Sequence, residues 1–460
     1  MYVDIASVDP DDYEVVVAGS GLAAFALSSR LSAAGKRVLI LESGEDQFEA
    51  QLQDDYTRMY GRGHFDGAHW PAHWVRALGG TSAVWSGWCA PLTERNLAKW
   101  PLRRAEVEPY YRLAAAYLRR SETFLTFSAP FLPGFTYRPM SLGLALRLAR
   151  EPELFERMGS VRVALRTTLV ALQPTSDRRA VAALSLHRPE APVQRLTLRP
   201  DQAVVLAAGG LGNAQILLNS RSDTSAAVGN ENDQVGRYLM EHPHMHDCAR
   251  IVAPASLRLP APPPGFGRSA DIVAPDDATY ARIGGLDVAL GFAEGPVDSD
   301  DPVERFLAAR MAGRTTAFDL TVRAEMPPEP ANRLERGEGT DPAGLPRLRA
   351  LCYIGTEAFR AVDLCLEALG AALVASGPAR LRIISDRLVD RVGGGGHIMG
   401  TTRMGRRPQS SVVDPDCRVH GYRNLFVAGS SVFPAGGYAN PTLTLMALAA
   451  RLGDRVGKGL

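Results

Sequence analysis

Two polar side chains near the C-terminus have the types and the surroundings needed to handle an alcohol. His397 follows four glycines and begins the stretch His-Ile-Met-Gly-Thr-Thr-Arg-Met-Gly, and Asn440 lies in Gly-Gly-Tyr-Ala-Asn-Pro-Thr-Leu-Thr. An imidazole titrates near neutral pH and can take a proton from a hydroxyl group. A carboxamide can hydrogen-bond the same oxygen as charge develops on it. The pair therefore predicts general-base chemistry on an alcohol.

Both residues also have structural interpretations. A lone histidine is more often packed and hydrogen-bonded, although a glycine-rich frame is unusual for a core element. Asn440 precedes Pro441, which biases it away from helix, and it can equally cap a helix expected at 442–456. The residues by themselves leave both interpretations open.

The beginning of the chain predicts a strand–helix–strand unit. The β-branched run at 14–19 is typical of a buried parallel strand, 25–34 favours a helix that Gly35 would end, and 37–42 is a second apolar run. Such a βαβ unit is the building block of a nucleotide-binding domain. The pattern therefore predicts a Rossmann-like parallel sheet.

The turn after the first of these strands reads Gly-Ser-Gly-Leu-Ala-Ala at 19–24 and fits the fingerprint G-x-G-x-x-G/A. Gly19 permits the tight turn, and Gly21 lets the backbone approach a pyrophosphate at the helix N-terminus. Glu42 ends the second strand, where its carboxylate can accept ribose hydroxyls. The order of these features favours a dinucleotide site over a merely structural glycine turn, without separating FAD from NAD.

A second glycine-rich element, Arg-Ala-Leu-Gly-Gly-Thr-Ser at 76–82, precedes Trp85 and Trp88. Paired glycines followed by hydroxyl side chains suit a loop that lies close to a planar or charged ligand. The two tryptophans can wall a flavin, although tryptophans beside a turn are more often core residues. The run Glu-His-Pro-His-Met-His at 241–246 matches no standard metal motif, so a turn or a cofactor-side loop is preferred, and His73 is interpreted as structural.

Length and composition favour a globular protein without a nucleic-acid or membrane partner. The chain has 460 residues, enough for two or three domains, with 46% hydrophobic residues and a formal net charge of +1. Five cysteines without CxxC spacing favour a reduced intracellular chain. The first residues lack the features of a secretory signal, and no apolar stretch approaches the roughly 18 residues of a membrane span. We therefore expect a cytoplasmic protein.

Strand-and-helix signals typical of a nucleotide-binding domain recur in the middle and at the end of the chain. Runs ending in glycine at 203–210 and 424–430 predict further buried strands. Alternating residues at 161–198 predict a β-meander, and proline-rich loops with alternating stretches at about 245–350 predict an inserted sheet. Helices are expected at 102–119, 213–219, 357–373 and 442–456.

Taken together, these motifs resemble the glucose–methanol–choline (GMC) oxidoreductase family. Within that family, the C-terminal motifs look most like those of pyranose oxidases and related sugar dehydrogenases. The segment 245–390 is barely diagnostic. The resemblance is carried by residues 15–44, 76–91, 203–219, 235–244 and 397–456.

The resemblance implies FAD as the cofactor, no metal, and a catalytic pair that falls on His397 and Asn440. Val84 stands at the position where some relatives carry a histidine linked to FAD, so non-covalent FAD is expected. The residues expected to contact the cofactor are Gly19, Gly21, Leu22, Ala23, Glu42, Ser43, Arg76, Gly79, Gly80, Thr81, Ser82, Trp85, Ala208, Gly209, Gly429, Ser430, Asn440, Pro441 and Thr442.

The predicted fold is α/β combined with α+β. A discontinuous Rossmann-like FAD-binding domain is expected at 1–100, 156–244 and 391–460. A mainly antiparallel-sheet substrate-binding domain is expected at 101–155 and 245–390.

The predicted function is oxidation of a CH–OH group of a sugar, amino sugar or glycoside to the carbonyl. His397 would act as general base and Asn440 would orient the oxygen, while hydride passes to flavin N5. A tailoring step in a natural-product pathway suits a compact intracellular chain. The alternatives are an oxidase or dehydrogenase of a sterol, terpene or aromatic alcohol, a non-redox GMC-type lyase, and a binding protein that kept the fold. The electron acceptor and the oligomeric state stay open.

Overall fold

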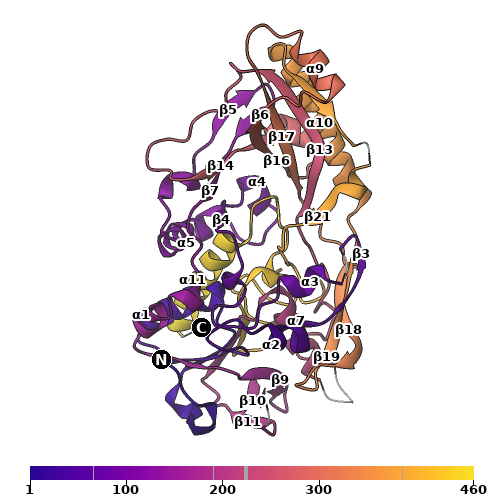
Figure 1. Ribbon diagram of the computed structural model, residues 1–460. Helices are drawn as coiled ribbons and strands as arrows, with labels where there is room; N and C mark the ends of the chain where they lie inside the picture. The colour runs from indigo at the N-terminus through magenta and orange to yellow at the C-terminus, as the bar shows by residue number, and fades with distance from the viewer. Residues whose placement is uncertain (66, 190, 222–225, 386, 460) are drawn as a thin grey trace.

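A five-stranded parallel sheet lies in the half of the molecule that holds both chain termini (Figure 1). The structure, a computed structural model, describes residues 1–65, 67–189, 191–221, 226–385 and 387–459. The sheet has the order β22-β12-β1-β2-β8, and all its neighbours are parallel. Its strands are β1 (Val15–Ala18), β2 (Val38–Leu41), β8 (Val161–Ala164), β12 (Ala203–Leu206) and β22 (Leu425–Val427). The predicted Rossmann-like sheet is confirmed.

Three helices connect or follow these strands and begin at the carboxyl edge of the sheet. They are α1 (Leu22–Ala33), α7 (Gly209–Asn219) and α11 (Thr442–Gly457). Helix α11 packs against α1 and against α5 (Arg104–Tyr117), where Tyr111 Oη lies 3.0 Å from Thr444 Oγ1. Since helices that follow parallel strands start at one edge of the sheet, their N-termini gather there.

The first glycine of the N-terminal turn is required by close contact between β1 and β12. Gly19 has φ +100°, and a Cβ atom there would lie 2.6 Å from the carbonyl oxygen of Ala207. Any other residue would be strained and would collide with backbone that cannot move away. The turn therefore positions the start of α1 beside the end of β12.

The predicted β-meander at 161–198 is correct except for its first strand. β9 (Thr168–Pro174), β10 (Val181–His187) and β11 (Gln194–Thr197) form an antiparallel three-stranded sheet. β8 instead pairs with β2 in the parallel sheet, and it buries Val161, Val163 and Ala164 there. A four-residue strand carries too little alternation to distinguish these two pairings.

An eight-stranded, mainly antiparallel sheet fills the other half of the molecule (Figure 1). Helix α10 (Thr356–Ser376) packs on it and buries Val362, Cys365 and Leu369 in a second hydrophobic core. The strand order is β20-β13-β17-β16-β15-β6-β5, with β21 also paired to β13. The strands are β5 (Ala129–Leu132), β6 (Phe135–Tyr137), β13 (Pro243–Pro254), β15 (Ile272–Pro275), β16 (Val288–Gly295), β17 (Thr315–Ala324), β20 (Arg380–Ile383) and β21 (Val392–Gly394).

Two small sheets and several short helices complete the described chain. β18 (Arg333–Thr340) and β19 (Pro346–Cys352) join β3 (Tyr60–Gly63), and β14 (Ser269–Ala270) and β4 (Trp88–Cys89) flank β7 (Met140–Leu142). Among the described residues, no helix is both long enough and apolar enough to cross a membrane. The short helices are α2 (Ala50–Thr57), α3 (His69–Ala72), α4 (Glu94–Leu97), α6 (Glu153–Glu156), α8 (Asp277–Arg282) and α9 (Pro302–Ala308).

The predicted division into two domains stays a prediction, and some elements make contacts across the predicted boundary. Helix α5, expected in the substrate-binding part, packs against α11 of the parallel-sheet half. β19 likewise pairs with β3, and β18 pairs with β19, near α7 (Figure 1). The antiparallel sheet itself is built from strands that begin at 129 and end at 394.

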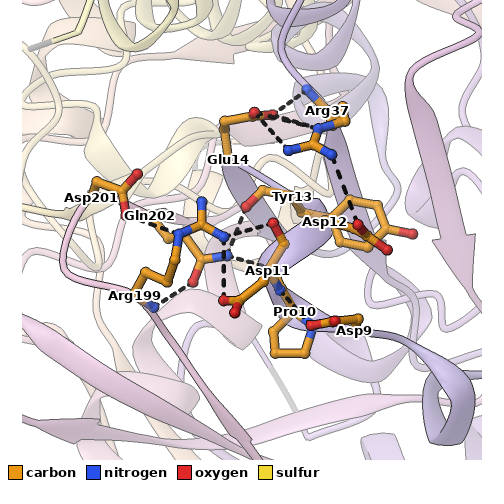
Figure 2. A network of polar contacts seen from close by, with 10 residues as sticks. All are labelled: Asp9, Pro10, Asp11, Asp12, Tyr13, Glu14, Arg37, Arg199, Asp201 and Gln202. Carbon is orange, nitrogen blue, oxygen red and sulfur yellow. Dashed lines mark hydrogen bonds and ion pairs between the residues drawn. The ribbon is translucent and has the colours of Figure 1, made fainter.

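A buried glutamine ties the N-terminal segment to the parallel sheet (Figure 2). Gln202, which is fully buried, donates from Nε2 to the carbonyl oxygens of Pro10 (2.5 Å) and Tyr13 (2.7 Å). Its Oε1 accepts a hydrogen bond of 2.6 Å from the amide of Arg199. Arg199 and Arg37 add ion pairs with Asp11, Asp12, Glu14 and Asp201 around this centre.

The Gln202→Leu substitution should lower the free energy of unfolding by roughly 3 kcal/mol. An unsatisfied buried polar group costs about 1–3 kcal/mol, and the backbone groups of Pro10, Tyr13 and Arg199 would each lose the hydrogen bond to Gln202. Urea denaturation followed by circular dichroism measures the change. Asp201→Ala is the matched control, since its exposed carboxylate only pairs with Arg199. A loss no greater than that of the control would contradict this role for Gln202.

Candidate active site

A cavity of about 550 Å³ lies at the carboxyl ends of β1, β2, β12 and β22. The antiparallel sheet contributes to its wall through His244 of β13 and Arg323 of β17. His397 lines the same cavity. So does every residue that the sequence predicts at the cofactor: Gly19, Gly21, Leu22, Ala23, Glu42, Ser43, Arg76, Gly79, Gly80, Thr81, Ser82, Trp85, Ala208, Gly209, Gly429, Ser430, Asn440, Pro441 and Thr442.

Three helix N-termini without side-chain caps open onto this cavity. The N-cap residues are Gly21 of α1, Ala208 of α7 and Pro441 of α11, and none of them makes a side-chain capping hydrogen bond. The first backbone N–H groups of a helix have no partner within the helix, and the helix dipole adds partial positive charge. Together these ends form a region suited to a negatively charged ligand.

Ser20, a position that the fingerprint leaves unspecified, links the two glycine-rich elements. Its Oγ donates to Glu42 Oε2 (2.5 Å) and accepts from the amide of Gly79 (2.9 Å). The amide of Gly44 donates to the other carboxylate oxygen of Glu42 (2.8 Å). Burial raises the pKa of Glu42, and these hydrogen bonds with the nearby Arg76 charge act against that rise. The carboxylate is thus fixed in place at the end of β2.

The aromatic side chains that follow the second glycine-rich element also reach the cavity. Trp85 and Trp88 are half-buried and line it, and Trp85 Nε1 donates to the carbonyl oxygen of Leu146 (2.9 Å). They are therefore wall residues rather than plain core. His73 lines the cavity as well, so its interpretation as a purely structural residue is incomplete. Val84 is half-exposed on the same wall.

Strand pairing places His242 beside His397. Just before β13, Met240 exchanges two backbone hydrogen bonds of 3.0 Å with Met399, and β21 pairs with the first residues of β13. Between these two points the imidazoles of His242 and His397 meet, with 2.9 Å between their Nδ1 atoms. The arrangement depends on residues that lie far apart in sequence.

The glycine run before His397 leaves room for imidazole rings. A Cβ atom on Gly395 would lie 2.5 Å from Nδ1 of His397 and 2.9 Å from Nε2 of His244. A Cβ atom on Gly394 would lie 2.1 Å from Cε1 of His69. These rings can pack against the run only because it has no side chains.

Glu241 holds the two histidine-bearing segments together. Its Oε1 accepts hydrogen bonds of 2.7 Å from the backbone amides of both His242 and His397, and its Oε2 lies 2.8 Å from Nε2 of His69. Burial raises the pKa of this fully buried carboxyl group. The contact with His69 and the two amides outweigh burial and leave the pKa below its usual value, so Glu241 is a carboxylate.

Both facing imidazoles are neutral at pH 7. Burial lowers the pKa of His397 well below 6.5, and His242, His244 and Arg323 lower it further. Burial lowers the pKa of His242 to about 4, even though the charge of Glu241 acts to raise it. A buried neutral histidine has one protonated and one bare ring nitrogen, so the contact between the two rings needs a defined proton arrangement.

The surroundings of His242 define that arrangement. Its Nε2 is buried and faces the backbone of Gly436 and Gly437, whose carbonyl groups raise its pKa, although the geometry falls short of a full hydrogen bond. An N–H group is favoured next to carbonyl oxygens, so Nε2 carries the proton and Nδ1 is bare. His397 must then donate from its own Nδ1, which leaves its Nε2 as an unprotonated nitrogen.

Asn440 lies ahead of the last helix without capping it. The N-cap of α11 is Pro441, and no side chain caps that helix. The Oδ1 atom of Asn440 is buried and has no hydrogen-bond partner in the described structure, while the residue lines the cavity. The capping interpretation is therefore wrong, and the carboxamide is available to a bound molecule.

The histidine run at 241–246 is divided among different surroundings. His242 contacts His397, His244 lines the cavity, and His246 is exposed. Across residues 1–65, 67–189, 191–221, 226–385 and 387–459, no three histidine, cysteine, aspartate or glutamate side chains are grouped to hold a metal. Of this run, His244 is the residue that lines the cavity.

Lowering the pH from 7.5 to 5 should weaken the fold through His242. Its pKa is 6.5 when unfolded and about 4 when folded, so between these values the unfolded chain binds more protons and stability falls as the pH falls. At about 1.36 kcal/mol per pH unit, the loss from this residue is about 2 kcal/mol at pH 5. Urea titrations at both pH values should show a smaller loss for His242→Phe, and equal losses would contradict the expectation.

Comparison with known proteins agrees with the geometry. Residues 328–449 match the family model described as GMC oxidoreductase. The fructose dehydrogenase large subunit of Gluconobacter japonicus is 25% identical over 304 residues, which are 63% of this chain and 52% of that protein. The 6'''-hydroxyparomomycin C oxidase of Streptomyces lividus is 28% identical over 309 residues, which are 65% of this chain and 52% of that protein.

The chain thus matches about half the length of these two curated relatives. The crystal structure of pyridoxine 4-oxidase from Mesorbium loti has the same fold, with a TM-score of 0.61, 17% identity, and coverage of 96% of this chain and 99% of that one. The family resemblance seen in the sequence motifs is confirmed by the match over the C-terminal third. The chain thus resembles the GMC oxidoreductase family, and residues 328–449 carry the family match.

Proposed function

We propose that this protein oxidises a CH–OH group of a sugar, amino sugar or glycoside to the carbonyl with non-covalent FAD. One observation carries the proposal: a buried, neutral histidine and a carboxamide whose oxygen has no partner among the described residues line the same cavity as an uncapped helix N-terminus, which follows a glycine-rich turn of the dinucleotide-binding type. The names of the sugar-directed and aminoglycoside-directed relatives support the substrate class. Cytoplasmic location and a natural-product tailoring role stay predictions from the sequence.

The residues around the cavity fit FAD, which the GMC family generally binds. The N-termini of α1, α7 and α11 suit the pyrophosphate, and Arg76 adds a buried positive charge to the wall. Glu42 can accept ribose hydroxyls with the lone pairs that Ser20 and Gly44 leave free. When bound, FAD would supply a hydride acceptor at its N5 atom.

His397 acts as the general base through Nε2. Because His242 accepts from Nδ1, the bare nitrogen is turned away from His242 and is free for a substrate hydroxyl. Once His397 has taken the proton, its Nδ1–H still donates to His242, and the carboxylate of Glu241 lies beside both backbones to stabilise the positive charge. His242 is a positioning residue in this scheme, since it fixes the tautomer and orientation of the base.

Asn440 complements the base from the other side of the reacting oxygen. Its side-chain amide can donate to the substrate oxygen as negative charge develops there, and a preorganised donor of this kind stabilises the transition state more than the ground state. The buried, unpartnered Oδ1 supports a side chain whose hydrogen bonds are completed by a ligand. The buried surroundings exclude water, which strengthens this interaction.

Non-covalent attachment is supported by the wall residue Val84, which has no nucleophilic atom. Acid precipitation should release the flavin into the supernatant. A flavin that stays with the precipitated protein would show that another side chain forms a covalent link.

The proposed function is tested by anaerobic mixing with an alcohol panel while the oxidised-flavin absorbance is followed. The panel contains sugars, aminocyclitols, glycosides, and aliphatic and aromatic alcohols. Loss of absorbance with sugars or glycosides supports the proposal, and loss with aromatic or aliphatic alcohols alone assigns a different substrate class. If no alcohol bleaches the flavin, the reaction is not an alcohol oxidation.

A further inference from the structure

An arginine without a counter-charge lies in the cavity wall. Arg323 of β17 is only 8% exposed and lines the cavity. Its guanidinium carbon lies 4.5 Å from the ring centre of Trp88, and its Nη1 atom lies 3.0 Å from the sulfur of Met140. Its Nε atom is buried with no partner in the described structure. An aromatic face and a thioether are weak partners for a full positive charge.

No carboxylate compensates this charge within the described chain. None lies within 4.0 Å of the Arg323 guanidinium, whereas other arginines of the same sheet, such as Arg250 and Arg382, pair with acidic residues. Burial lowers the pKa of Arg323 to about 10, so the group stays charged at neutral pH. The cavity wall has one acidic residue among the described ones, Glu42, and Ser20 and Gly44 hold it at the end of β2. Burying an unpaired charge is costly, so an anionic ligand is the missing partner.

The strand register puts this charge close to the base. Arg323 stands directly opposite His244 in the antiparallel pair β13–β17, and the ring centre of His244 lies 5.8 Å from that of His397. The charge of Arg323 is close enough to lower the pKa of His397, and both residues line the same cavity. One small molecule can therefore present a hydroxyl to His397 and an anionic group to Arg323.

We propose that Arg323 binds the carboxylate of an acidic alcohol substrate, as in a uronic or aldonic acid, while His397 takes the proton of its hydroxyl. The proposal rests on the proposed function and narrows its substrate class. A planar guanidinium matches a carboxylate with two parallel hydrogen bonds. His244 is neutral, because burial lowers its pKa to about 2, so Arg323 is the positive charge on this strand pair, and a single guanidinium matches a monoanion better than a phosphate dianion. A cationic amino sugar would be repelled.

Binding of matched acids and neutral analogues to the FAD-loaded protein tests the proposal without requiring turnover. Isothermal titration calorimetry compares D-glucuronate with D-glucose, D-galacturonate with D-galactose, and D-gluconate with D-glucitol. At least one acid should bind roughly 10- to 100-fold more tightly than its neutral partner, the range expected for a charge-assisted hydrogen-bonded pair. If no acid binds more tightly than its neutral partner, the proposal is wrong.

Variants at position 323 test whether Arg323 is the group that binds the carboxylate. Arg323→Met, which keeps an apolar shape beside Met140 and Trp88, should remove the preference for the acid and leave affinity for the neutral analogue within about twofold. Arg323→Lys should retain part of the preference, because the charge stays but the planar fork is lost. Arg382→Met is the control, since that arginine of the same sheet already pairs with Asp301. If Arg323→Met does not fold, the wild-type comparison and Arg323→Lys still test whether Arg323 gives the preference for the acid.

Two other outcomes overturn the proposal in distinct ways. If Arg323→Met leaves the acid preference intact, another group binds the carboxylate. If it lowers flavin reduction equally for acids and neutral alcohols and shifts the flavin reduction potential, Arg323 acts on the cofactor. Failure of the proposed function has a different signature, because acids would then still bind selectively while no alcohol reduces the flavin.

Discussion

The His397→Ala variant is expected to reduce bound flavin about 10²–10⁴-fold more slowly than the wild-type protein, the range that general-base catalysis typically contributes. The substitution removes the ring that contacts His242 and lines the cavity, and with it the Nε2 atom proposed to take the proton of the substrate hydroxyl. Flavin content should stay near that of the wild type, because the expected pyrophosphate and ribose contacts lie on other segments. Anaerobic stopped-flow absorbance measures the rate.

His246→Ala is the matched control for this experiment, because His246 belongs to the same histidine run but is exposed. It should reduce flavin at the wild-type rate. A His397→Ala variant that reduces flavin at nearly the normal rate with full flavin content would show that another group takes the proton.

The His242→Phe variant is expected to slow flavin reduction by roughly 10²-fold while the base itself stays in place. Phenylalanine keeps much of the ring volume but cannot accept a hydrogen bond, so His397 is no longer held with its proton on Nδ1. A base held in the wrong tautomer loses most of its catalytic contribution, as in catalytic triads whose orienting group is altered. Single-turnover reduction rates across pH 6–9 provide the measurement.

His242→Gln separates positioning from packing, because its side-chain oxygen can accept from Nδ1 of His397. It should recover part of the lost rate. A purely structural role predicts instead that both variants lose thermal stability in parallel with activity, and that the glutamine gives no rescue. That pattern would remove His242 from the mechanism.

The sequence signals that predict the cofactor end of the cavity are local. The turn at Gly19 and Gly21, the acidic strand end at Glu42 and the helix starting after Pro441 each depend on neighbours within a few residues. Local sequence also determines the buried runs of the parallel strands. All of these residues line one cavity, although their contacts with FAD are proposed rather than observed.

The substrate end could not be predicted in the same way, because it depends on pairing between distant strands. Nothing in the run at 241–246 shows that His242 lies against His397, since their approach follows from the pairing of Met240 with Met399. Arg323 can be placed beside the histidines only when its register with His244 is known. Ser20 was hidden for another reason: the fingerprint accepts any residue there, so the pattern gave no signal.

The short distance along the chain between His242, just before β13, and His244, within it, has a consequence for how such an enzyme can change its specificity. Position 323 belongs to a separate strand, so natural selection or laboratory evolution can vary it and alter the accepted substrate while the proton-transfer machinery is left intact. Position 244 is different, because it is two residues from the group that fixes the tautomer of His397 and its ring lies beside the catalytic one. We expect active variants with a new substrate range to arise through position 323 far more often than through position 244.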